Sequence, residues 1–301
     1  METKNNRVYT SFFIVLHLKQ IYKIIISPRN ISKPKKRSKL RRYLGKRFYI
    51  TKRTILQLSG KETYSSYRSK QKLPFHFFSH ESILLRQLKD VDMVLQYDKI
   101  HNLKMAISNI DGIVIKPGET FSLWKLIGNP SKRNGYKKGM VLESGQVKSG
   151  YGGGLCQLGN LIYWMLLHTP LTVKERWRHS FDVFPDTNRT LPFGSGATIS
   201  FNYIDLQFKN ETDSDFQLNL WLSDTYLNGE FNSKKENRHQ YEVFESDHLI
   251  HHAPWGGYTR HNRIKRKVSD KISGKEVKEE LVTENHAIMM YEPLLSEPIN
   301  P

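Results

Sequence analysis

The single cysteine of the chain, Cys156, follows three consecutive glycines in the segment 149–168, SGYGGGLCQLGNLIYWMLLH. Residues 155–168 are apolar on almost every side, so we expect a buried helix whose first turn holds the thiol. A helix N-terminus leaves backbone N–H groups unpaired and carries partial positive charge, which favours a thiolate. The sequence therefore indicates a candidate nucleophile.

A nucleophilic thiol needs a base and a group that orients this base. His179 in ERWRHSFDVFPD is the candidate base, and Asp182 or Asp186 would orient its ring. The alternative is structural, because free cysteine is among the most buried residue types. A lone histidine can equally bond a backbone carbonyl in the core. The residues alone leave both interpretations open.

The residues around the thiol suggest a binding surface. Gly152, Gly153 and Gly154 would let the backbone approach a substrate, and the N–H of Cys156 or Gln157 would then face an oxyanion. The alternative is that the glycines only allow a strand and a helix to approach each other, and that Gln157 caps the helix or faces solvent.

Histidines cluster near the C-terminus, in DHLIHHAPWGG and at His261. Imidazoles suit zinc, copper or nickel, but the spacing of His248, His251 and His252 matches no known ligand set. One cysteine excludes a disulfide framework and a zinc site built on several thiolates. We expect no metal and no cofactor, and we find no P-loop, dinucleotide fingerprint or HExxH motif.

Positive charge is confined to the first part of the chain. Residues 1–72 contain 20 Lys and Arg against Glu2 and Glu62, whereas the other residues contain 27 of each sign. Such a basic arm is attracted to anionic lipid, nucleic acid or an anionic cell-wall polymer, and charge alone does not choose among them. A solvated tail is the alternative. No nucleic-acid partner is expected, because no recognised binding module accompanies the arm.

The segment 11–26 is apolar in two pieces that two lysines and a glutamine interrupt. A central lysine costs roughly 2.5–3.5 kcal/mol on insertion, so a spanning helix is disfavoured, and no small-residue cleavage site follows for a signal peptide. We expect an interfacial helix here, followed by the polybasic run 33–47. Residues 1–47 would then dock on an anionic membrane surface, with the protein cytoplasmic and peripheral at the inner face of the membrane. A helix packed on the main domain is the alternative.

The chain divides into a basic arm or linker over 1–72, a core domain over 73–232 and an extension over 233–301 that we expect to pack on the core. KETYSSYRSKQK at the end of the arm is predicted to be linker or exposed surface. The expected fold class is α+β, with amphipathic helices and one buried central helix packed on an antiparallel sheet.

Periodicity and turn residues predict the other elements. Apolar spacing predicts amphipathic helices over 82–97 and 100–110. Pro117 and Gly118 predict a type II turn that joins strands over 113–115 and 121–124. Further signals predict a strand in 139–147, antiparallel strands after 197, a turn over 210–215 and a hairpin at Asn228-Gly229.

Three blocks resemble, in this order, the signature blocks of the VanW family. They are IDGIVIKPGETFSLWKLIG, then GYKKGMVLESGQVKSGYGGGLCQLGNLIYWMLLHTPLTVKERWRHSFDVFPD, and GSGATISFNYIDLQFKN. The resemblance covers roughly residues 90–222. It implies an association with the bacterial envelope or with glycopeptide resistance, in a family that has no settled biochemical activity. Glu119 of PGETFS joins the candidate binding residues on this basis.

The family pattern differs at Gly196, where many relatives carry aspartate. If that aspartate orients the base in those relatives, Asp182, Asp186 or Asp205 would have to replace it here. Two functions follow. The first is acyl transfer or amide hydrolysis by Cys156 and His179 on a peptidoglycan-related peptide. The second is a non-catalytic binding module that holds an envelope precursor or partner beside GYGGG, with the basic arm docked on an anionic surface.

Overall fold

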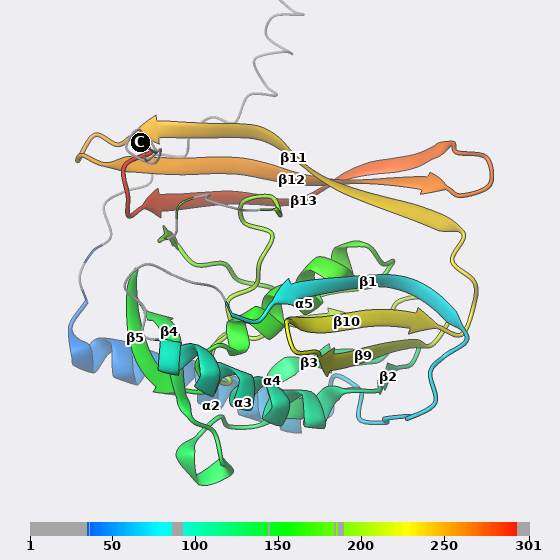
Figure 1. Cartoon of the computed structure of the whole chain (residues 1–301), viewed down its shortest axis with the longest axis horizontal. Helices are drawn as coiled ribbons and strands as arrows, with labels where there is room; N and C mark the ends of the chain where they lie inside the picture. Colours follow the sequence, from blue (N-terminus) through cyan, green and yellow to red (C-terminus); the bar gives the residue numbers. More distant parts are fainter. Residues whose placement is uncertain are drawn as a thin grey trace, which may run out of the picture.

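A computed structural model of the chain describes residues 35, 37–85, 93–143, 145–183, 185 and 190–293 (Figure 1). The α-helices of these residues all lie before residue 168, consecutive strands follow, and the sheets are mostly antiparallel, so the predicted α+β class is confirmed. The helices are α2 (Lys39–Leu58), α3 (Met93–Ile110), α4 (Leu123–Ile127) and α5 (Leu155–Leu167), with a 3-10 turn η1 (Lys132–Asn134). The strands are β1 (Phe75–Ile83), β2 (Ile113–Ile115), β3 (Thr120–Ser122), β4 (Lys138–Glu143), β5 (Gln146–Tyr151), β6 (Thr172–Glu175), β7 (Phe181–Asp182), β8 (Gln207–Lys209), β9 (Phe216–Leu222), β10 (Tyr226–Ser233), β11 (His239–His252), β12 (Tyr258–Asp270) and β13 (Glu276–Met289).

Helix α5 forms the centre of the core, as its apolar sequence predicts. Ten of its residues are buried, and it packs against the sheet β1-β10-β9-β2. At Gly229 in β10, an added Cβ would lie 2.6 Å from Cε of Met165 and 3.1 Å from Cδ2 of Leu161. The hairpin predicted at Asn228-Gly229 is therefore wrong. Gly229 lies within β10 and leaves space for the side chains of α5. The chain turns earlier, between β9 and β10, where Ser223 N–H donates to Tyr226 O at 2.9 Å.

The predicted turn at Pro117-Gly118 forms, but the strands on its two sides join different sheets. Glu119 N–H donates to Lys116 O at 3.0 Å, and Gly118 has φ of +82°. Strand β2 pairs with β9 and β3 pairs with β8, so the expected pairing of the two strands is wrong. The second strand is also shorter than predicted, because Ser122 caps a helix: its Oγ accepts from Lys125 N–H at 3.3 Å.

The helix predicted over 82–97 is wrong at its start. Ser82 and Ile83 belong to β1, which pairs with β10 along its length, and α3 begins only at Met93. Backbone pairing with a long neighbouring strand overrides the local apolar spacing. The helix predicted over 100–110 lies within α3. It ends at Asp111-Gly112, where the glycine has φ of +73°.

Residues 59–72 lie along the core and are not a free linker. Thr120 N–H donates to Thr63 O at 2.8 Å, Ser65 N–H donates to Thr120 O at 3.0 Å, and Val114 N–H donates to Tyr67 O at 2.8 Å. Ser65 is buried. These bonds place the segment beside β2 and β3, because short edge strands offer free backbone groups to pair with.

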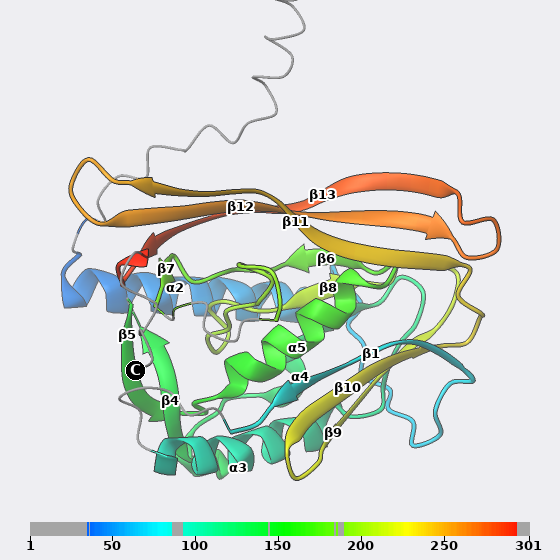
Figure 2. The same cartoon turned by 45° about the horizontal axis from the view of Figure 1, so that its top comes forward.

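The C-terminal strands form a second layer above α5 (Figure 2). Strands β11, β12 and β13 are antiparallel, and β7 adds to β13 in parallel. Arg266 ties this layer to the end of α5, since its guanidinium donates to Leu167 O at 3.0 Å and Thr169 O at 2.8 Å. Helix α5 thus lies between two sheets. The predicted domain boundaries stay a prediction.

Candidate functional site

The three glycines at the start of α5 are in close contact with neighbouring protein atoms. Gly152 and Gly154 have φ of +71° and +91°. A Cβ on Gly153 would lie 2.1 Å from the carbonyl carbon of Gly139, and one on Gly154 would lie 2.0 Å from Cγ of Lys99. Protein atoms therefore occupy the space that a side chain would take, and the glycines serve the approach of α5 to β4 and α3.

Cys156 is the second residue of α5, at the edge of the buried core. Its Sγ donates to Ile199 O at 3.8 Å. Burial raises the pKa of the thiol. Removal from water disfavours the charged form of this thiol, and the thiolate expected at the helix N-terminus stays a prediction.

Gln157 holds the start of α5 against the end of β1. Its Nε2 donates to Ser82 Oγ at 2.9 Å and to Ile83 O at 2.8 Å, and its backbone N–H donates to Gly154 O at 2.9 Å. The side-chain amide and the backbone N–H of Gln157 thus both have protein partners. Glu119 has a similar local role, since its Oε2 accepts from Lys116 N–H at 3.0 Å across the turn.

His179 lies between β6 and β7. Burial lowers its pKa, and the charge of Arg178 lowers it further, so the ring is neutral near pH 7. Trp177, two residues before it, forms a β-bridge with Thr198, which precedes the residue whose carbonyl accepts from the thiol. The tertiary structure brings the segment between β6 and β7 near the start of α5, yet within the described part of the chain no hydrogen bond joins Cys156 and His179.

The carboxylate of Asp182 binds the C-terminal layer. Its Oδ2 accepts from Tyr291 Oη at 2.9 Å and lies 3.4 Å from the guanidinium of Arg260, and both charged side chains are buried. Asp182 thus ties β7 to β12. Asp186, the other predicted orienting residue, lies outside the described residues.

A buried carboxylate site forms where the first and third signature blocks meet. Asp205 is fully buried, and its carboxylate accepts four hydrogen bonds. The donors are Ser122 Oγ at 2.6 Å, Gln207 Nε2 at 2.9 Å, Leu206 N–H at 2.9 Å and Trp124 N–H at 3.1 Å. Burial still raises the pKa of Asp205, although these donors and Arg53 oppose it. Asp205 therefore holds Ser122 and Trp124 beside the start of β8.

Arg53 of α2 extends this cluster to the basic arm. It forms two 2.7 Å hydrogen bonds with the carboxylate of Glu175, and its Nη1 lies 3.9 Å from Asp205. Burial opposes the charge of Arg53, but the hydrogen bond and charge of Glu175 outweigh it, so the pKa of Arg53 is raised. Sequence reasoning missed this pair. The motifs PGETFS and IDLQF contain Ser122 and Asp205 and so indicated this part of the cluster. Nothing in the sequence distinguished Arg53 from the other basic residues of the arm.

Two of the C-terminal histidines, His248 and His261, are bonded to other side chains. Arg260 Nε donates to His248 Nε2 at 2.9 Å, and His261 Nε2 lies 2.9 Å from Thr259 Oγ1. His261 Nδ1 lies 2.7 Å from His286 Nδ1. Burial and neighbouring positive charge lower the pKa of His261 to about 4. In the ranges that the structure describes, no three His, Cys, Asp or Glu side chains group in a way that could hold a metal ion.

Comparison with known proteins identifies two relatives. Residues 98–232 match the family model described as VanW like protein. The chain is 37% identical over 171 residues to the vancomycin B-type resistance protein VanW of Enterococcus faecalis, over 57% of this chain and 62% of that protein. It is 30% identical over 111 residues to the uncharacterized protein YoaR of Bacillus subtilis, over 37% of this chain and 35% of that protein. The chain thus spans less than two thirds of either relative, and no solved structure matches it.

Proposed function

Since residues 98–232 belong to the VanW family, we propose that the protein is an accessory factor in glycopeptide resistance at the bacterial cell envelope. Within this role the geometry favours a non-catalytic binding module for a peptidoglycan-related peptide. The resistance role rests on the name of the relative from Enterococcus faecalis. The choice of binding over catalysis rests on the state of Cys156.

Acyl transfer by a cysteine needs a thiolate, a base in reach and free donors for an oxyanion. Here the thiol donates to Ile199 O, and burial raises its pKa. The amide and the backbone N–H of Gln157 have partners within the protein. Catalysis at Cys156 would require breaking several of these hydrogen bonds. Binding a ligand at the protein surface leaves all of them in place.

Strand β5 is the surface that best fits such a ligand. It leads directly into the glycines, and within the described residues it pairs on one side only, with β4. Val147 and Tyr151 expose 39% and 41% of their surface there. An extended peptide can add to such an edge through backbone hydrogen bonds, while exposed apolar side chains contact alternate residues of the peptide.

Calorimetric titration with a soluble peptidoglycan stem peptide tests this function. We expect wild type and Cys156→Ala to bind it equally, with the peptide recovered unchanged by mass spectrometry. Val147→Asp is expected to weaken binding, because it places a charge on the edge surface. Ile272→Asp, at an exposed site in the loop between β12 and β13, serves as the matched control and is expected to bind like wild type.

Alkylation of Cys156 by iodoacetamide at graded pH provides the second measurement. The binding module predicts slow labelling with an apparent pKa above about 8.5, the value of a free thiol. A labelling pKa below that value, together with peptide cleavage or transfer that Cys156→Ala abolishes, would establish the Cys156–His179 enzyme instead. No binding of the stem peptide by wild type would reject this ligand class.

A further inference from the structure

Helix α2 turns an apolar stripe toward solvent along the outside of the molecule. The stripe consists of Leu40, Leu44, Phe48, Ile55 and Leu58, whose exposed fractions lie between 55% and 78%. At 100° per residue these five positions fall within an arc of about 80° on the helix. No residue of α2 is buried. A surface helix normally packs its apolar face on the core of its own protein. In α2 the apolar stripe faces solvent instead.

The buried network at Arg53 fixes this orientation. On the helical wheel Arg53 lies roughly opposite Leu44, and its guanidinium binds Glu175. It also donates to Asn202 O at 3.1 Å and to Tyr203 O at 3.2 Å. Four hydrogen bonds therefore hold the polar side of α2 on the body of the protein and keep the apolar stripe outside.

The charge of α2 indicates which surface the stripe contacts. The helix has no Asp or Glu and carries seven basic residues, namely Lys39, Arg41, Arg42, Lys46, Arg47, Lys52 and Arg53. Arg41 and Lys52 flank the stripe on one side, and Arg47 flanks it on the other. A protein partner could match the apolar face, but basic residues around a narrow apolar stripe are typical of helices that lie in the interface of an anionic membrane.

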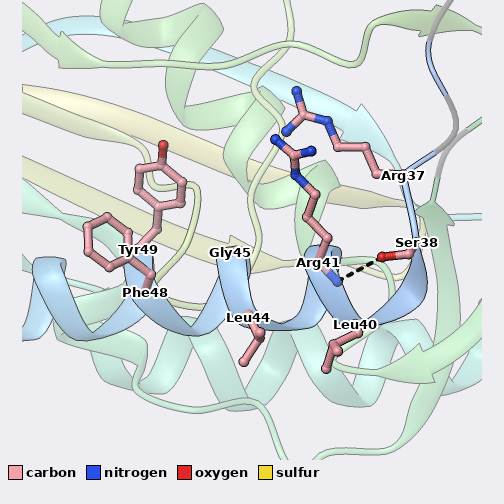
Figure 3. Close-up of a pocket in the computed structure, with 8 residues that line it drawn as sticks. All are labelled: Arg37, Ser38, Leu40, Arg41, Leu44, Gly45, Phe48 and Tyr49. Carbon is pink, nitrogen blue, oxygen red and sulfur yellow. Dashed lines mark hydrogen bonds between the residues drawn. The ribbon is translucent and has the colours of Figure 1, made fainter.

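The first turns of α2 add a basic hollow beside the stripe (Figure 3). Arg37 and Arg41 extend to one side of the helix, and Phe48 and Tyr49 lie at the other end of the hollow. Gly45 lies between them, and a Cβ on this residue would have no atom within 4 Å. A phosphate headgroup placed there would face two guanidinium groups, and the nearby Leu40 and Leu44 would meet the acyl chains.

We propose that the outer face of α2 docks the protein on an anionic lipid surface, with the apolar stripe inserted and the basic flanks on the headgroups. The described helices include none with the length and apolar character that spanning a membrane requires. The predicted interfacial helix over 11–26 lies outside the described residues. The inference does not depend on the proposed peptide binding, which a different assay measures.

Co-sedimentation of the full chain with vesicles tests the docking. The vesicles are phosphatidylcholine alone or an equimolar mixture of phosphatidylcholine and phosphatidylglycerol. We expect wild type to partition onto the anionic vesicles, and the double variant Leu44→Ser, Phe48→Ser to partition at least about tenfold less, because inserting one such side chain contributes about 1.5–3 kcal/mol. The control variant Ile272→Ser, Leu281→Ser removes two other exposed apolar side chains and is expected to behave like wild type.

Three results would overturn the docking proposal. If the Leu44→Ser, Phe48→Ser variant sediments like wild type, the stripe does not attach the chain to the vesicles. If wild type stays in solution as a dimer that this variant dissociates, the stripe binds a second copy. If wild type stays in solution and a chain without residues 1–34 binds, the apolar segment 11–26 covers the stripe. Unchanged thermal melting of both variants verifies that the exposed substitutions leave the fold intact.

Discussion

Replacing Asp205 by alanine is expected to destabilise the protein strongly, because its carboxylate is fully buried. The carboxylate accepts four hydrogen bonds between 2.6 and 3.1 Å, two of them from the backbone N–H groups of Trp124 and Leu206. Alanine would leave both N–H groups buried without an acceptor. It would also remove one of the two carboxylates near Arg53.

The size of the effect follows from these donors. A buried donor left unsatisfied costs about 1–3 kcal/mol, so two backbone groups account for roughly 2–6 kcal/mol. The raised pKa of Asp205 shows that burial opposes its charge, and removing the charge returns part of this cost. We therefore expect a net loss of about 3–4 kcal/mol in the free energy of unfolding, a large share of the typical 5–15 kcal/mol.

Urea denaturation followed by tryptophan fluorescence measures this loss as a lower midpoint at unchanged slope. Asp205→Asn keeps Oδ1 for the two backbone donors, but its Nδ2 cannot accept from Gln207 Nε2 and the charge is lost. We therefore expect a loss smaller than that of alanine, about 2 kcal/mol. Asp213→Asn is the surface control, because its carboxylate is fully exposed and bonded to Lys235, and we expect the wild-type midpoint. If Asp205→Ala unfolded at the wild-type midpoint, the buried hydrogen-bond network described above would be refuted.

Two further predictions concern the core around α5. Gly154→Ala should lower the free energy of unfolding by about 2–4 kcal/mol, because it adds a Cβ at positive φ that collides with the side chain of Lys99. Gly60 also has positive φ, but its Cβ would lie in open space. Gly60→Ala should therefore cost only about 1–2 kcal/mol in the same denaturation assay. His168 stacks on Phe78, and burial lowers its pKa to about 4. The folded protein therefore holds the ring neutral, and its contribution to the free energy of unfolding is complete above pH 6.5 and declines as the pH falls toward 4. Thermal melting between pH 7 and 4 should show a smaller decline in His168→Phe, and an equal decline in both proteins would contradict the assignment.

The start of α5 shows how far the sequence predicts the candidate site. The apolar run 155–168 and the preceding glycines located the buried helix, because side chains that are apolar on all sides must be buried. The protonation state of Cys156 was not predictable from the same residues. Its pKa depends on how many protein atoms replace water around Sγ and on the carbonyl of Ile199, which comes from a distant segment.

The sequence by itself determined the α+β class, the central helix, the turn at Pro117-Gly118 and the division between a basic arm and a neutral remainder. These features depend on local backbone preferences, on hydrophobic periodicity or on composition, all of which a short window contains. The tertiary structure decided which strands pair, why Gly229 is a glycine and which face of α2 meets solvent. That last choice depends on Arg53 and Glu175, which are distant in sequence and meet only in the folded chain.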